Sequence, residues 1–173
     1  MSTWSIDTTR SAIRFSVRHL LFARVRGRFR AFGGTVELDE RDLLRSSVEV
    51  SIDAASIDTG DDERDRQVRA PDFLDVGKFP KLGYKSTRIE KAGGRYRIHG
   101  ELTIREVTRT VVLDAKDGGR TREPSGASRA AFSATTSIDR HDFGLEWSPL
   151  LETGGVLVGD RIDIELEVQA VET

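Results

Sequence analysis

Apolar and polar residues alternate along most of the chain, and this period of two is its strongest feature. Strict alternation of this kind is typical of antiparallel strands that bury one face and leave the other in water. Runs with this period fall in residues 13–18, 36–38, 48–52, 96–104 and 111–113. The clearest run is near the C-terminus, where Ile162, Ile164, Leu166, Val168 and Ala170 alternate with Asp163, Glu165, Glu167 and Gln169.

Turn signals separate these runs. The pairs Gly33-Gly34, Gly93-Gly94 and Gly118-Gly119 supply positions for turns or bulges, and residues 123–127 contain Pro, Ser and Gly. About eight strand candidates result, and closing so many strands into a barrel removes exposed sheet edges. The sequence therefore predicts an all-β fold, an eight-stranded antiparallel barrel, and one domain over residues 1–173.

One segment breaks the alternation. Residues 61–76 are highly charged, and their first half predicts a short exposed helix with Asp58 or Thr59 as its cap. Pro71 is expected to end that helix or to begin a further turn. A second short helix is predicted around Arg140–Phe143, so the barrel should carry one or two short helices.

Composition excludes several classes of protein. The chain has 27 basic and 29 acidic residues, a net charge of −2, which argues against a nucleic-acid-binding protein. Without cysteine it has no disulfide, thiol nucleophile or Cys-ligated zinc. Residues 1–7 have neither the basic nor the apolar region of a signal peptide, and no window reaches the roughly 18 apolar residues of a transmembrane segment. We expect a cytoplasmic protein.

Catalytic motifs are not evident. The histidines, His19, His99 and His141, are far apart in sequence and form no HExxH pattern, and no Gly-x-Ser-x-Gly motif occurs. The sequence therefore predicts no catalytic residue, no metal and no cofactor. An alternative is a small barrel enzyme that uses His19 or His141.

A charged feature leaves a further alternative open. Arg24, Arg26, Arg28 and Arg30 alternate through one strand, and the simplest interpretation is that they form its solvated face. A basic strip could also meet a phosphate head group or an acidic partner. Together with the charged helix at Asp61–Arg69, it would suit a ligand-free barrel that binds another protein.

Ordered short motifs carry a resemblance to a known family. Residues 4–7 and 13–20 (WSID, IRFSVRHL), 25–29 with 32–35 (VRGRF, FGGT) and 47–60 (SVEVSIDAASIDTG) are followed by 72–76, 78–80 and 85–87 (DFLDV, KFP, KST). Further along come 100–104 with 107–109 (GELTI, VTR), 137–140 with 142–144 (SIDR, DFG) and 158–160 (VGD). In this order the chain resembles the YceI family of lipocalin-like proteins.

The resemblance implies an eight-stranded antiparallel barrel with a helix over one end and an elongated apolar pocket inside. It implies a long isoprenoid lipid as the ligand, such as a polyprenyl phosphate or an isoprenoid quinone, and it allows a homodimer. Alternation by itself fits a filled barrel as well as a hollow one. In the segment 81–84, the glycine at position 83 departs from the family pattern and is expected to widen the pocket locally.

Alternation and family position together predict the residues that line the pocket. Trp147, in the loop before the last strand, is expected to close one end. The predicted ligand-binding residues are Phe15, Val17, Phe29, Val36, Val48, Val50, Ile52, Phe73, Phe79, Tyr84, Leu102, Val111, Leu113, Phe132, Phe143 and Trp147.

Overall fold

The computed structural model describes residues 1–19, 23–146 and 158–173. Strands dominate it, with one α-helix and three short 3₁₀ turns between them. The strands are β1 (Ser2–Ile6), β2 (Ala12–His19), β3 (Ala23–Phe29), β4 (Phe32–Leu38), β5 (Ser47–Asp53), β6 (Ile57–Asp58), β7 (Lys81–Ala92), β8 (Arg95–Ile104), β9 (Val107–Arg122), β10 (Ser128–Asp139) and β11 (Val158–Glu172). The helix is α1 (Asp62–Arg69), and the 3₁₀ turns are η1 (Leu43–Arg45), η2 (Ala54–Ser56) and η3 (Arg140–Phe143).

The strands form a closed antiparallel barrel. Both β1 and β2 pair with β11, one after the other along its length, so together they act as one interrupted barrel strand. The pairs β3 with β4 and β5 with β6 are interrupted in the same way, because β4 pairs with β1 and β5 whereas β3 pairs with β2 and β6. Counted so, the barrel has eight strands, as the sequence predicts.

The glycine pairs have three different roles. Gly93-Gly94 makes the predicted hairpin, since Ala92 pairs with Arg95 and Gly93 has a φ of 64°. Gly118-Gly119 lies within β9, opposite a register shift in β10, and is a bulge. The expectation of a turn at Gly33-Gly34 is wrong, because both residues lie in β4. A Cβ at Gly34 would stand only 3.1 Å from the Val50 Cα, so this glycine allows close backbone approach instead.

Helix α1 lies where the charged segment predicts a helix, but its cap differs. Asp61 is the N-cap, and its carboxylate accepts from the backbone N–H groups of Glu63 and Arg64 at 3.0 and 3.1 Å. Asp58 is still part of β6 and accepts from the Gly60 N–H, so the helix begins later than expected. Among the described residues, no helix is long and apolar enough to cross a membrane.

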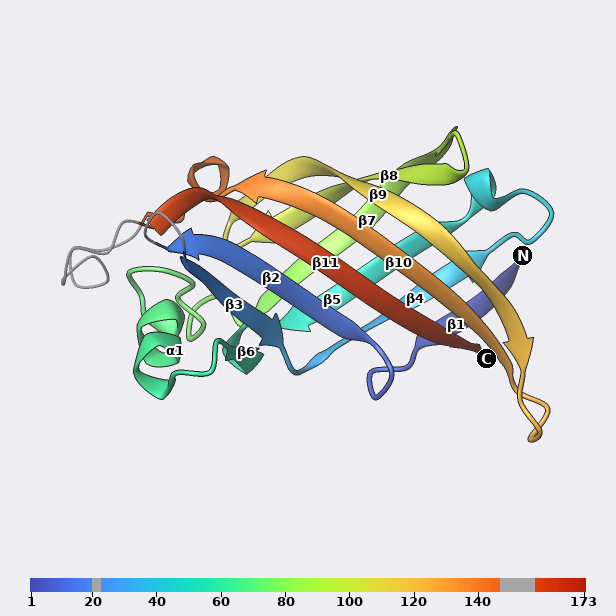
Figure 1. The fold of residues 1–173 in the computed structure, drawn as a ribbon, viewed down its shortest axis with the longest axis horizontal. Coiled ribbons are helices and arrows are strands. Elements are labelled where there is room, and N and C mark those ends of the chain that lie inside the picture. The colour runs from blue at the N-terminus through green and yellow to red at the C-terminus, as the bar shows by residue number, and fades with distance from the viewer. Residues whose placement is uncertain (20–22, 147–157) are drawn as a thin grey trace.

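The two ends of the barrel differ. Helix α1 lies at one end and both chain termini lie at the other (Figure 1). Near the termini, a compact cluster of buried side chains consists of Trp4, Val36, Leu38, Ala130 and Ala170, each at most 7% exposed. A larger cluster occupies the rest of the barrel and continues beneath α1, where Val68, Phe73 and Leu74 are buried.

Candidate ligand-binding cavity

A cavity of about 470 Å³ occupies the barrel interior. Its volume is within the range of roughly 300–1,000 Å³ that is usual for small-molecule sites. The wall consists mainly of inward-facing apolar side chains, because alternation places every second residue of each strand on the inner face. The interior of this barrel is therefore hollow over part of its length, a property that alternation could not predict.

Most of the predicted ligand-binding residues line this cavity. Whether they contact a ligand stays a prediction. The residues in the wall are Phe15, Val17, Phe29, Val36, Val48, Val50, Ile52, Phe73, Tyr84, Leu102, Val111, Leu113 and Phe132.

Two expected residues do not line the cavity. Phe143 is 1% exposed, but it belongs to η3, beyond the end of β10, and packs into the core there. Phe79 lies before β7 and is only partly buried, and the Lys78 Nζ is 5.5 Å from its ring centroid. Trp147 lies outside the described residues.

Gly83 does not widen the pocket. Its neighbours Leu82 and Tyr84 are buried and line the cavity, so the intervening residue faces the outside of the barrel. A Cβ at this position would be 3.8 Å from the Val50 carbonyl oxygen, an ordinary contact. The expectation of local widening is therefore wrong, because position 83 faces away from the cavity.

The wall also includes apolar residues that the sequence interpretation left out. Ile98 shares the inward face of β8 with Leu102, and β11 contributes four residues at alternate positions. Those on β11 are Ile162, Ile164, Leu166 and Val168. All of them belong to the alternating runs, so applying the same parity along each strand would have found them.

Tyr84 brings a polar group into the apolar wall. Its hydroxyl donates to the carbonyl oxygens of Ile98 and Val111, each 3.1 Å away. Burial raises the pKa of Tyr84 well above its ordinary value, so the hydroxyl stays protonated at neutral pH. These hydrogen bonds to β8 and β9 satisfy the hydroxyl within the wall.

Besides Tyr84, several polar side chains reach the cavity at the α1 end. Thr59, Asp61, Glu63, Arg64 and Gln67 are part of the wall there. The Arg64 guanidinium donates to both the hydroxyl and the carbonyl oxygen of Thr59, at 2.9 and 2.8 Å. This end can therefore accommodate the polar head of a ligand whose chain lies in the apolar interior.

Arg140 is a buried cation in the wall at the same end of the barrel, since it follows β10 directly. It is 6% exposed and donates to the carbonyl oxygens of Leu145 and Gly159, at 2.9 and 3.2 Å. It also forms an ion pair with Asp160 at 3.4 Å. These acceptors stabilise the buried charge and join the chain after η3 to the start of β11.

The two histidines whose side chains are described, His99 and His141, each pair with a separate carboxylate. His141 Nε2 lies 2.8 Å from Asp160, and its side chain is 45% exposed and outside the cavity wall. His99 Nε2 lies 2.8 Å from Glu90, and this hydrogen bond lowers the pKa of Glu90. The His19 side chain is outside the described part of the structure. Within that part, no group of three or more His, Asp or Glu residues is placed to hold a metal.

The arginines of β3 lie on the outer face of the barrel. Arg24 forms an ion pair with Asp163 at 2.9 Å, and Arg30, directly after β3, pairs with Asp58. Arg26 is exposed between them. This arrangement agrees with a solvated strand face whose charge is partly balanced by nearby acids.

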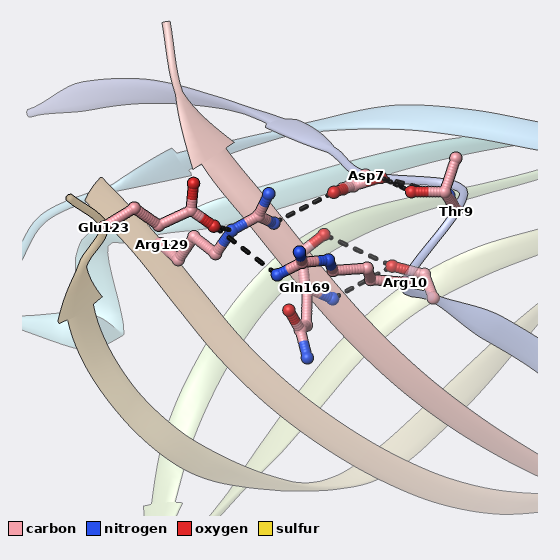
Figure 2. A network of polar contacts seen from close by, with 7 residues as sticks. Asp7, Thr9, Arg10, Glu123, Arg129 and Gln169 are labelled. Carbon is pink, nitrogen blue, oxygen red and sulfur yellow. Dashed lines mark hydrogen bonds and ion pairs between the residues drawn. The ribbon is translucent and has the colours of Figure 1, made fainter. Parts of the chain in front are cut away.

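A polar network fastens the barrel where β1 and β2 are interrupted (Figure 2). Arg129 on β10 donates to Asp7 at 2.9 Å and also bonds Glu123, which Arg10 approaches to 3.4 Å. Hydrogen bonds from the Thr9 side chain and from Arg129 lower the pKa of Asp7. The network therefore holds the 7–11 loop against the β9–β10 hairpin and β11, on the outside of the cavity.

Comparison with known proteins identifies the family. The model of the YceI-like domain matches residues 4–170, which is nearly the whole chain. The chain belongs to the YceI family. A UPF0312 protein of Vibrio parahaemolyticus is 33% identical over 170 residues, which cover 96% of this chain and 86% of that protein.

Solved structures share the YceI fold. BcnA of Burkholderia cenocepacia superposes with a TM-score of 0.83 at 24% identity, covering 95% of this chain and 98% of BcnA. A polyisoprenoid binding domain from Saccharophagus degradans gives a TM-score of 0.74 at 15% identity, with both chains covered completely. At these identities the two likenesses establish the barrel fold.

Proposed function

We propose that this protein binds a long isoprenoid lipid inside its barrel, as a carrier, store or sensor, and that it is not an enzyme. The observation that carries the proposal is the cavity of about 470 Å³ with its predominantly apolar wall. The lipid class is suggested by the YceI family and by the structural neighbour described as a polyisoprenoid binding domain.

The energetics of burial support a chain of this kind. Each buried methylene contributes roughly 0.8 kcal/mol, so a five-carbon isoprene unit contributes on the order of 3–4 kcal/mol. A few units would offset the cost of association without a strong polar contact. We place the polar head, a phosphate or a quinone ring, at the α1 end, where Thr59, Arg64 and Gln67 reach the cavity.

The enzyme alternative has less support. It needs polar groups that converge inside the cavity, but His141 is outside the wall and paired with Asp160. The Tyr84 hydroxyl, which does reach the apolar interior, is already satisfied by two backbone acceptors. A binding role therefore fits this arrangement better.

Native mass spectrometry of protein purified gently from its own host tests the proposal. We expect a bound mass that denaturing spectra lose, and an organic extract that contains a prenyl lipid. Ultraviolet absorbance of the extract separates an isoprenoid quinone from a polyprenyl phosphate. Protein that carries no such mass, and takes up neither type of lipid when it is supplied, would contradict the proposal.

Two further expectations remain predictions. The cytoplasmic location follows from sequence features alone, and cell fractionation tests it. The homodimer follows from the family resemblance, and light scattering on the purified protein tests it.

A further inference from the structure

Two aromatic rings of the cavity wall lie directly over glycines. Phe15 on β2 is paired in register with Gly27 on β3. The Tyr84 ring, on β7, lies over Gly100 of the neighbouring strand β8. An ideal Cβ on either glycine would stand closer than 3.0 Å to atoms of the ring, a distance that real side chains do not show. The missing side chain therefore leaves the space that each ring occupies, and we call this space the seat of the ring.

Both glycines face the interior. Gly27 lies between Val25 and Phe29, and all three share a parity that puts the two flanking side chains in the cavity wall. Gly100 has the same relation to Ile98 and Leu102 on β8. Any side chain at these two positions would point into the barrel, in contrast to one at Gly83.

The seats hold the rings flat against the wall. The Tyr84 ring extends along the wall, because its hydroxyl reaches the carbonyl oxygens of Ile98 on β8 and Val111 on β9. The Phe15 ring lies over β3, where its centroid is 5.7 Å from that of Phe29. Phe15 and Tyr84 line the cavity and the glycines do not, as expected if the rings cover them.

We infer that Gly27 and Gly100 set the internal width of the cavity, its bore, and thereby determine the width of the chain that it accepts. This inference deepens the proposed lipid function and rests on it. A methyl group on either glycine occupies the seat, so the ring swings toward the barrel axis and narrows the lumen. A methyl-branched isoprenoid chain then loses the room that it needs.

The coupling between ring and glycine gives a decisive test with all-trans-geranylgeraniol as the probe. We expect Gly100→Ala to weaken binding at least tenfold, whereas Tyr84→Leu, which removes the ring, sets the reference affinity for the double variant. The double variant Gly100→Ala/Tyr84→Leu should bind like Tyr84→Leu, because no ring remains to be displaced. Gly83→Ala, on the outer face of β7, is the matched control and should change nothing.

Folding is checked for every variant by circular dichroism. If Gly100→Ala does not fold, the double variant is expected to fold, since it relieves the clash. Gly27→Ala with Phe15→Leu repeats the test independently on the other wall. Normal binding by folded Gly100→Ala, or an equal loss in the Tyr84→Leu background, would overturn the inference.

A second probe separates this inference from the proposed function. N-phenyl-1-naphthylamine is an apolar fluorescent dye without an isoprenoid chain, and it reports on any apolar lumen. If the unmodified protein binds the dye but not geranylgeraniol, the lipid proposal fails, and the same variants still test the bore. If it binds neither, the inference fails too.

Discussion

The two parts of the barrel interior are built from the same alternating pattern, but they are packed differently. Near the termini, Trp4 is 2% exposed, Ala130 1% and Ala170 0%, and none of the three lines the cavity, so side chains fill the barrel there. Other inward side chains, from those beneath α1 to Val36 and Leu38 beside this cluster, line a cavity of about 470 Å³. Alternation decides which way a residue faces, whereas the sizes and directions of the facing side chains decide whether space remains.

The filled part should be the most sensitive to truncation. Trp4 is among the largest completely buried side chains, and its indole N–H donates to the Ser2 hydroxyl at 2.8 Å. We expect Trp4→Ala to lower the free energy of unfolding by about 3–5 kcal/mol, because it leaves a void in a close-packed region. Urea unfolding measures this loss, and a cost below about 1 kcal/mol would show that this end is not tightly packed.

A matched pair of leucines sharpens the contrast. Leu38 is 2% exposed and packs in the cluster with Trp4 where this cluster meets the cavity, so Leu38→Ala should cost about 2–5 kcal/mol. Leu102 is only partly buried and borders the cavity, so Leu102→Ala should cost less than about 2 kcal/mol in the ligand-free protein, since fewer contacts are lost. Equal losses in urea unfolding would contradict the division of the interior.

At the α1 end of the barrel, Arg105 in the turn between β8 and β9 is bonded to the segment that follows α1. Its φ is 55°, a left-handed conformation, and its Nη1 donates to the Phe73 carbonyl oxygen at 3.1 Å. Alanine and glycine both remove this bond, but glycine adopts the conformation without strain. We expect Arg105→Gly to be more stable than Arg105→Ala by about 1 kcal/mol in thermal unfolding, and the reverse order would mean that the backbone is unstrained.

The outer face gives the smallest expected effect. Hydrogen bonds from the Ser137 hydroxyl, Arg24 and Arg161 lower the pKa of Asp163 to about 2. The unfolded chain, with a pKa of about 3.9, binds the proton more tightly, so the stability from Asp163 is complete above about pH 4 and is lost as the pH falls through about 2.

Solvent screening limits this contribution to about 1 kcal/mol. The stability difference between the unmodified protein and Asp163→Asn should therefore narrow between about pH 4 and pH 2 in urea unfolding. A difference that is constant over this interval would mean that the carboxylate is not stabilised by these partners.

The sequence predicted the barrel well because local alternation reports directly on strand faces. It also predicted the helix in the charged segment and a second short helix around Arg140–Phe143, which is the 3₁₀ helix η3. It placed the helix cap at Asp58 or Thr59 rather than Asp61, because the extent of β6 depends on pairing with the distant β3.

The shape of the cavity could not be predicted in this way. Phe79 and Phe143 are aromatic and near strands, but their positions depend on how the chain leaves β10 and enters β7. The seats at Gly27 and Gly100 depend on which ring crosses which neighbouring strand. Such contacts are a property of register between strands, and a period of two along one strand does not contain them.

The central claim is that a lipid occupies the hollow part of the barrel, and blocking the lumen tests it most directly. Ala134 on β10 is buried and lines the cavity, whereas the next residue, Thr135, is exposed on the outer face. Native mass spectrometry should show that Ala134→Phe loses the bound lipid mass, while the matched variant Thr135→Phe keeps it. Retention of the same lipid by folded Ala134→Phe would contradict binding inside the barrel.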